Sequence, residues 1–417
     1  MSHLLIVDLP GGNDTDILTC ARELGHRVSL LTADPDHYRG QSEVAQALSG
    51  AEIIAAPGFA MQTLLADLQA RHRVDPFAAV LCLQDLRIVE SAEIAQALGL
   101  RHLNPVTARL ARDKAAVRRH LERHGLPQPA CLEAEGAGQL LAAVASVGLP
   151  ALIKPADGFG SQNVFALRTP ADLDTLHQLA SLVAAGPGTY GLGVMAGRRM
   201  LVERLIEGQL IGLDTMSAGG QHRLLAVNEK LMFAPPSFAM RGGCLSVNIG
   251  QFSALEAHAF ALLDAIGFDH GAAHIEMILS TQGPVLVEIN PRLVGARIAR
   301  LLSAGLGRSV HADLIALHCD GRLPDAAPQG HHVANRWLGA PCAGELTALE
   351  MPDIANLPAS FTMMARVGDA VTPPLDNADR LGMVMAWGDD RAMAEAQADA
   401  LLAATRLTIT PAQNGDA

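Results

Sequence analysis

Alternating polar residues on both sides of one predicted turn are the strongest candidates for chemistry in this chain. The turn covers residues 281–284 (Thr-Gln-Gly-Pro), and the flanking runs of Ile, Val and Leu predict two strands joined as a β-hairpin. If the turn is centred on residue 282, Glu276 lies opposite Glu288, and His274 lies opposite Asn290. Because side chains alternate across a strand, these residues then share one face of the hairpin.

This polar face calls for a positive charge between its two acids. Carboxylates directly opposite each other lie about 5 Å apart, and like charges there destabilise the pair. Mg²⁺ binds carboxylate oxygens, keeps some waters and often completes its shell with substrate phosphates. An acidic, solvated outer face is the alternative, since a register shift of one residue would separate the acids. The other face should pack on the core through Ile275, Met277, Leu279, Val285, Val287 and Ile289.

A lysine followed by a glycine-rich turn is a second candidate, this time for binding phosphate. Residues 149–155 predict a strand that carries Lys154 near its end, and residues 156–163 form a turn rich in Gly, Ser and Asn. The free backbone N–H groups of such a turn, with an ammonium group nearby, favour an anion. An ordinary hairpin loop is the alternative, and no G-x-x-x-x-G-K-[ST] motif occurs in the chain.

The elements that must position these residues suggest a mixed α/β architecture. Buried strands are predicted at residues 3–9, 27–32 and 78–82, with helices at 14–25 and 88–98, which is typical of a small doubly wound domain. One strongly basic helix is predicted over residues 108–124, and it either is solvated or faces an anion. Beyond residue 331, strand-like runs precede an Ala-rich helix at 391–405.

Composition excludes several classes of protein. The chain has 417 residues, 49% hydrophobic and 18% charged, which predicts a globular protein of two or three domains. The net charge of −12 and the lack of a basic stripe argue against nucleic-acid binding, and no apolar run is long enough to span a membrane. The 6 cysteines are scattered without a CxxC motif, so we expect free, buried thiols and a cytoplasmic protein.

Taken in order, five segments resemble the ATP-grasp superfamily, and within it the carboxylate–amine ligases that include L-amino acid ligases and carnosine synthase. They are Asp113-Lys114, Lys154 with its glycine-rich turn, residues 203–208 (Glu-Arg-Leu-Ile-Glu-Gly), His274-Ile-Glu276 and residues 288–292 (Glu-Ile-Asn-Pro-Arg). The resemblance covers roughly residues 75–330. It implies an α/β and α+β protein with the ATP-grasp fold. An N-terminal doubly wound domain (1–103) would precede the ATP-grasp region (104–330, lid about 130–205) and a small β-rich C-terminal domain (331–417).

The resemblance also implies roles for individual residues. For ATP it implies Lys114 and Lys154 on the α- and β-phosphates, a mobile turn with Gly158, Gly160, Ser161 and Gln162, and an adenine hinge of Glu203, Arg204, Leu205 and Ile206, with Lys230 nearby. For catalysis it implies Arg292, Lys154 and His274, and for one or two Mg²⁺ ions, or Mn²⁺, it implies Glu276, Glu288 and Asn290. Arg241, Gly295 and Arg297 are the candidates for binding substrate.

Two of these roles stay open at the level of sequence. His274 could orient Glu276, contact the substrate or be structural. Relatives often carry an acid two residues after the hinge glycine to bind ribose, but Leu210 stands there, so this contact falls to Glu203 or Gln209.

The implied reaction joins a small-molecule carboxylate to an amine through an acyl phosphate and releases ADP and phosphate, with an amino acid as one substrate. An ATP-grasp carboxylase or purine-pathway-type ligase is the alternative enzyme. A non-catalytic ATP-binding protein on the same fold is the alternative of another class. Neither nucleic acid nor membrane is expected as a partner, and a homodimer is expected by analogy.

Overall fold

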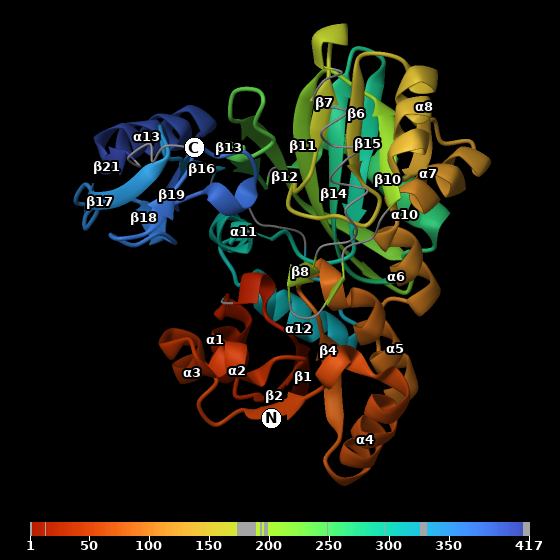
Figure 1. Ribbon diagram of the computed structural model, residues 1–417. Helices are drawn as coiled ribbons and strands as arrows, with labels where there is room; N and C mark the ends of the chain where they lie inside the picture. Colours follow the sequence, from red (N-terminus) through yellow and green to blue (C-terminus); the bar gives the residue numbers. More distant parts are fainter. Residues whose placement is uncertain are drawn as a thin grey trace.

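The computed structural model describes residues 2–12, 14–172, 189–191, 194–195, 199–247, 249–295, 297–325 and 332–411 (Figure 1). Part of the predicted lid, about residues 130–205, therefore lies outside the described residues. Within the described ranges, no helix is long and apolar enough to cross a membrane.

The N-terminal part is built on a parallel sheet with the strand order β3-β2-β1-β4. Its elements are β1 (His3–Val7), α1 (Asp16–Glu23), β2 (Arg27–Thr32), α2 (Pro35–Arg39), α3 (Ser42–Ala47), β3 (Glu52–Ala55), α4 (Met61–Val74), β4 (Phe77–Leu81) and α5 (Ile88–Leu98). Every residue of β1 is buried, as expected for a strand covered on both faces. The predicted doubly wound arrangement is confirmed. Sequence patterns missed β3, because only Ile54 of its four residues is buried.

The basic stretch forms two helices instead of the single predicted one. They are α6 (Pro105–Arg112) and α7 (Lys114–Arg123), and Asp113 between them has an extended backbone. The side chain of Asp113 accepts a hydrogen bond from the backbone N–H of Ala116 at 2.9 Å and so caps α7. The prediction of one helix was wrong because an N-cap residue was counted as helical.

A four-stranded antiparallel sheet, in the order β5-β10-β6-β7, follows these helices. Its elements are β5 (Cys131–Glu135), α8 (Ala137–Val147), β6 (Ala151–Pro155), β7 (Phe165–Leu167) and β10 (Arg199–Arg204). Strand β6 carries Lys154, and the glycine-rich turn joins β6 to β7. The predicted strand–turn–strand unit around Lys154 is therefore confirmed.

An eight-stranded sheet, in the order β15-β14-β11-β12-β13-β16-β20-β18, is the largest sheet among the described residues (Figure 1). Its strands are β11 (Gln209–Ala218), β12 (Gln221–Met232), β13 (Met240–Ser246), β14 (His270–Ser280), β15 (Gly283–Asn290), β16 (His332–Leu338), β18 (Ala359–Met363) and β20 (Gly382–Gly388). The accompanying helices are α10 (Ser253–Ile266), α11 (Ile298–Leu306), α12 (Val310–Asp320) and α13 (Arg391–Ala404). A small sheet of β19 (Ala370–Val371), β17 (Gly344–Glu350) and β21 (Arg406–Pro411) lies near the C-terminus.

The predicted hairpin is the β14–β15 pair, and the predicted pairing of its polar residues is confirmed. Glu276 pairs with Glu288, and His274 pairs with Asn290. The turn is tighter than predicted, because Ser280 already pairs with Gly283. A bulge in β15 compensates for the tighter turn and brings the two acids opposite each other.

The same bulge corrects the prediction for the apolar face. Met277 pairs with Leu286, which leaves Val287 as the extra residue of the bulge. Leu286 is therefore buried in the core beside Ile289, whereas Val285 and Val287 are only partly buried. The assignment of both valines to the core face was wrong, because strict alternation does not hold across a bulge.

The cysteines are free, and their burial varies. Cys20, Cys82 and Cys244 are buried, but Cys342 is exposed, so the prediction of buried thiols throughout was wrong. Burial raises the pKa of the Cys82 and Cys244 thiols to about 12, so both remain protonated at neutral pH.

Candidate active site

A cavity of about 690 Å³ opens where the ends of the N-terminal strands meet the hairpin face of the large sheet. Loops after β1 and β4, the glycine-rich turn, strands β12, β14 and β15, and the segment before β20 all contribute to its wall. Predicted site residues in the lining are Gly160, Ser161, Gln162, Lys230, His274, Glu276, Glu288, Asn290, Arg292 and Gly295. In an α/β protein, this position beyond the carboxyl ends of parallel strands is a common ligand site.

Each acid of the hairpin is paired with a lysine from another element. Lys230 of β12 donates a hydrogen bond to Glu276, and Lys114, the first residue of α7, lies 3.1 Å from Glu288. Lys114 also donates to the backbone carbonyl of Gly158 at 2.5 Å. Lys114 therefore connects the glycine-rich turn directly to the acid pair.

Both acids are held in the ionised form. Burial alone would raise the pKa of each carboxyl, but Lys230 beside Glu276 and Lys114 beside Glu288 hold both pKa values below the ordinary range. For Glu288, the neighbouring Glu276 opposes this shift, and a 2.8 Å hydrogen bond from Asn290 Nδ2 supports it. Both carboxylates are therefore ionised at neutral pH, and each already has an ammonium group beside it.

The donor set fits a hard divalent cation that brings further ligands with it. Two ionised carboxylates face each other, and the amide oxygen of Asn290 lies on the same face of the hairpin. Among the described residues, no group of three or more His, Cys, Asp or Glu is arranged to hold a metal alone. An ion at Glu276 and Glu288 would therefore complete its shell from water or a bound phosphate, as Mg²⁺ commonly does.

His274 lies behind the acid pair and connects it to Asp214. Its Nδ1 is 2.8 Å from Asp214 Oδ1, and its Nε2 is 3.1 Å from the Lys230 ammonium and 3.4 Å from Glu276 Oε1. Burial would lower the pKa of His274, but Asp214 raises it overall. A Cβ at Gly212 would come within 2.5 Å of the imidazole, so glycine is needed there. Of the three roles open for His274, these contacts favour orientation of Glu276 and Lys230.

Lys154 is buried at 4% exposure and is held by Glu203 of β10. Its ammonium is 2.6 Å from one carboxylate oxygen of Glu203, while Arg118 of α7 donates to the other at 2.6 Å. Burial alone would raise the pKa of Glu203, but Arg118 and Lys154 hold it at about 2. Because this carboxylate is already engaged by two cations, the arrangement does not favour the suggested ribose contact of Glu203. The other candidate, Gln209, donates to the carbonyls of Leu210 and Lys230.

Arg292 lines the cavity and is held by Asp85 from the loop after β4. The Arg292 Nε donates to Asp85 Oδ2 at 2.8 Å, and Nη2 donates to the same oxygen. Burial opposes ionisation of Asp85, but Arg292 and Arg112 hold its pKa below the ordinary value. The N-terminal part of the chain thus fixes the direction in which Arg292 points.

The structure does not bring every predicted residue to the cavity. Arg241 is exposed on β13, where it is the extra residue of a bulge: Leu231 pairs with Gly242 and Met232 with Met240. Arg297 caps α11 with a left-handed backbone and acts electrostatically on Asp14 and Asp16, outside the cavity lining. The interpretation of both arginines as substrate clamps is not supported. The hinge residues Glu203, Arg204, Leu205 and Ile206 also lie outside the lining, so their contact with adenine stays a prediction.

Several polar residues at the cavity were missed from sequence. Asp85, Gln84, Asn228 and Arg380 line it, and Asp214 supports His274 from behind. No local motif marks them, and the partners of Asp85 and Asp214, which are Arg292 and His274, are far along the chain.

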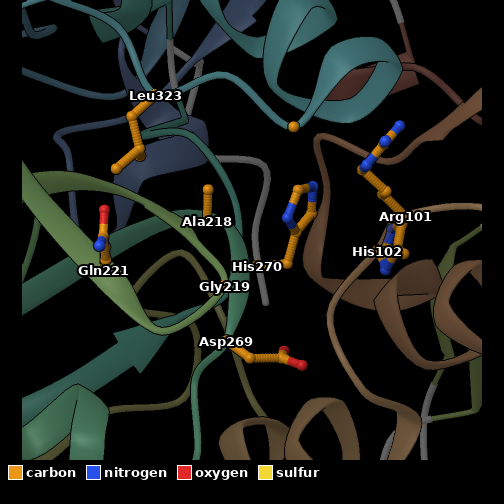
Figure 2. Close-up of a pocket in the computed structure, with 9 residues that line it drawn as sticks. Arg101, His102, Ala218, Gly219, Gln221, Asp269, His270 and Leu323 are labelled. Atoms are coloured by element: carbon orange, nitrogen blue, oxygen red, sulfur yellow. The ribbon is translucent and has the colours of Figure 1, made fainter.

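A second cavity, of about 530 Å³, lies between the segment after α5, the β11–β12 turn and the start of β14. Figure 2 shows His270 at its centre, with Arg101 and His102 on one side and Gln221 and Leu323 on the other. Its described lining contains one carboxylate, Asp269, and no lysine. It therefore lacks the opposed acids and ammonium groups that the first cavity offers to a nucleotide.

Three histidines beside this second cavity, His270 and His318 buried and His102 partly buried, predict a loss of stability in mild acid. His318 packs against His102 and His270 with ring centroids 5.3 and 5.1 Å apart. Burial lowers the pKa of all three below 6.5, that of His102 to about 4. The unfolded chain therefore binds protons that the folded chain does not, so stability is full above pH 6.5 and falls as the pH drops toward 4.

We expect the melting temperature of the wild type to fall through this pH window, and His318→Gln to make the fall shallower. Each unit of pKa depression contributes about 1.4 kcal/mol to the pH dependence. Thermal melts between pH 7.5 and 4 test this, with the exposed His124→Gln as a control whose slope should match the wild type. Equal slopes for His318→Gln and wild type would contradict the assignment.

Comparison with known proteins places these features in a family context. Residues 147–300 match the ATP-grasp domain, and residues 336–410 match the L-amino acid ligase C-terminal domain 2. Carnosine synthase 1 of Homo sapiens is 26% identical over 323 residues, which cover 70% of this chain and 36% of that protein. The chain thus spans little more than a third of that relative's length.

Solved structures agree with the matched domains. The L-amino acid ligase from Bacillus licheniformis has a TM-score of 0.79 at 16% identity, covering 98% of this chain and 99% of that one. The biotin carboxylase domain of 2-oxoglutarate carboxylase from Hydrogenobacter thermophilus, solved with MgADP, ADP and bicarbonate, has a TM-score of 0.70 at 14% identity, covering 98% and 91%. The ATP-grasp fold and the family resemblance predicted from sequence are confirmed.

Proposed function

We propose that this chain, which carries an ATP-grasp domain and an L-amino acid ligase C-terminal domain, is an ATP-dependent ligase that joins a carboxylate to an amine. The observation that carries the proposal is the opposed, ionised pair Glu276 and Glu288, set in one cavity with Lys230 and Arg292 and joined to the glycine-rich turn by Lys114. Such an arrangement suits a triphosphate, because phosphoryl transfer mainly requires positioning and charge neutralisation.

The proposed reaction has two steps that balance. An oxygen of the substrate carboxylate attacks the γ-phosphorus of ATP, and the bond to ADP breaks. The nitrogen of the amine then attacks the acyl carbon, the C–O bond to phosphate breaks, and the amine loses a proton as the amide forms. One carboxylate oxygen therefore leaves in the phosphate.

The residues of this chain contribute by binding and orientation. Arg292, aimed by Asp85, presents its guanidinium to the transferring phosphoryl group and the acyl phosphate. Lys114 and the buried Lys154 supply positive charge for the α- and β-phosphates, and Glu203 keeps Lys154 in place. Mg²⁺ bound by Glu276 and Glu288 would neutralise charge on the phosphate oxygens.

The glycine-rich turn has a separate role in this scheme. Gly160, Ser161 and Gln162 line the cavity, so the turn can cover a bound triphosphate. Exclusion of water by this cover would protect the acyl phosphate from hydrolysis. His274 would keep Glu276 and Lys230 in position and would not itself react with the substrate.

The division of the chain at residues 103/104 and 330/331 also belongs to this proposal. The N-terminal sheet has a hydrophobic cluster of its own, formed with α4 and α5. The C-terminal segment is joined to the central one through the pairing of β13 with β16, and so shares its sheet. A homodimer, expected by analogy, stays a prediction.

The alternative functions are less well supported. A carboxylase or purine-pathway-type ligase would share the fold, but the C-terminal match is to an L-amino acid ligase domain. A protein that only binds ATP would not need the opposed acids, the lysines and the oriented arginine together in one site.

The test is whether ADP release requires both substrates. Purified protein would be assayed with ATP, Mg²⁺ and pairs drawn from the standard amino acids, β-alanine and small organic acids, with mass spectrometry of the products. We expect release only when a carboxylate and an amine are both present, with an amide as product. Dependence on bicarbonate would support a carboxylase, and ATP binding without release for any pair would support a binding protein.

A further inference from the structure

The segment before β20 places a buried arginine in the wall of the proposed active site. Arg380 lines the same cavity as the acid pair but is only 5% exposed. Strands β11, β12, β13 and β16 separate β20 from β14 in the large sheet. Arg380 therefore approaches the cavity from a part of the sheet well away from the strands that carry Glu276 and Glu288.

The guanidinium of Arg380 has no anionic partner among the residues that the structure describes. Its Nε donates to the backbone carbonyl of Asn377 at 2.8 Å, and its Cζ lies 3.8 Å from the centroid of the Trp337 ring. Its Nη1 is buried and has no hydrogen-bond acceptor. The other fixed cations of the lining are paired, Lys230 with Glu276 and Arg292 with Asp85.

This arrangement is costly unless an anion completes it. A buried charge without a partner destabilises a protein, and burial lowers the pKa of Arg380 to about 9 with only Asp376 opposing the shift. The planar guanidinium matches the geometry of a carboxylate, to which it can donate two hydrogen bonds. Stacking on Trp337 keeps that plane in one orientation before any ligand arrives.

The segment that carries Arg380 is anchored to the wall of the cavity. The backbone N–H of Met240 donates to the side chain of Asn377 at 3.0 Å, and that of Phe238 donates to the carbonyl of Leu375 at 3.0 Å. The position of the guanidinium is therefore fixed by β13 and the residues before it.

A second polar group in the wall is also without a partner. Asn228 of β12 is fully buried and lines the cavity, and both of its side-chain amide atoms lack hydrogen bonds. Together, Asn228 and Arg380 offer a neutral polar contact and a cationic contact to one bound molecule.

We propose that Arg380 binds the carboxylate of the amine substrate and is the residue that selects amines carrying that group. This proposal rests on the function proposed above. The carboxyl group that is phosphorylated must lie near Arg292 and the acid pair, so an anion held by Arg380 is one that the reaction leaves intact. The amine end of the same molecule would then point toward the acyl phosphate.

The experiment compares free amino acids with their carboxamides as amine substrates. Each of the standard L-amino acids and its amide would be supplied as the amine, with ADP release and product mass as readouts, for wild type and Arg380→Met. We expect wild type to prefer the free acids by about 30-fold or more in kcat/KM. The Arg380→Met variant should lose that preference because its KM for the free acids rises. Its KM for ATP and its use of the amides should match the wild type.

Controls separate this role from a structural one. Arg380→Lys should restore part of the preference, because lysine returns the positive charge without the paired N–H donors of the guanidinium. Arg366→Met, at an exposed position, should behave as wild type. Two results would overturn the proposal and leave the ligase assignment standing. One is that the wild type uses free acids and amides equally well; the other is that Arg380→Met lowers kcat/KM equally for free acids and amides.

Binding measured without turnover distinguishes the two proposals. Saturation-transfer NMR with the same free amino acids and amides, in the absence of ATP, should show binding of the acids that Arg380→Met removes. If this holds while no pair of substrates releases ADP, the ligase assignment fails and the carboxylate site stands. If wild type binds acids and amides alike, the carboxylate site fails.

Discussion

Replacement of Glu288 by glutamine should lower kcat for ADP release by about 10³-fold or more while the chain stays folded. Glutamine keeps the shape of the side chain but removes the charge that faces Glu276 and pairs with Lys114 at 3.1 Å. Without that charge, a divalent ion loses one of its two carboxylates. The change should therefore appear in steady-state kinetics as a fall in kcat and a higher Mg²⁺ concentration at half-maximal rate.

The matched control is Glu229→Gln, on the same large sheet. Glu229 is on β12, pairs with Arg391 and lies outside the cavity lining. Glu229→Gln removes the same charge from β12, which β14 and β11 separate from β15, so kcat and the Mg²⁺ dependence should stay close to the wild type. Full activity of Glu288→Gln would remove the hairpin from the mechanism, and equal loss in both variants would indicate a general effect of charge.

Replacement of Arg292 by methionine should lower kcat by about 10³-fold, the lower end of the effect found for arginines that stabilise phosphoryl transfer. Methionine fills much of the same space but cannot donate hydrogen bonds to the transferring group. The KM for ATP should change little, because Lys114 and Lys154 are still present to hold the other phosphates. Initial rates at varied ATP, with the melting temperature of each variant, measure this separation.

Arg300→Met provides the comparison. Arg300 is also held by an aspartate of the N-terminal part, through hydrogen bonds of 2.7 and 2.8 Å to Asp16, but it lies outside the cavity lining. The Arg300→Met variant should lose about as much stability as Arg292→Met but keep the kcat of the wild type. If both variants lose the same activity, Arg292 acts only by joining the N-terminal part to the hairpin.

The parts of the site that sequence predicts best depend on local patterns. The pairing of Glu276 with Glu288 follows from alternation about a recognisable turn, and it holds because the bulge in β15 compensates for a turn that is tighter than predicted. The same bulge is invisible in the pattern, so the core role of Leu286 was missed. Local patterns gave the right register here but could not show how it is achieved.

The parts that sequence does not predict are contacts between distant segments. Arg292 and Asp85 are far apart in the chain and meet only because the N-terminal sheet packs beside the hairpin. Arg118 belongs to the basic stretch that sequence left as either solvated or facing an anion, and it is buried against the Glu203 carboxylate. Arg241 shows the opposite error, because it is the extra residue of a bulge in β13 and is exposed there, and no local pattern marks that bulge. Such contacts depend on tertiary packing, which no local motif records.

The central claim, that a carboxylate is activated by phosphorylation before the amine attacks it, is most directly tested by following an oxygen atom. In the two-substrate assay, the carboxylate substrate would carry ¹⁸O in its carboxyl group, and the released phosphate would be examined by mass spectrometry. With both carboxyl oxygens labelled, we expect one ¹⁸O atom in the phosphate for each amide formed. Amide and ADP formed with unlabelled phosphate would contradict it.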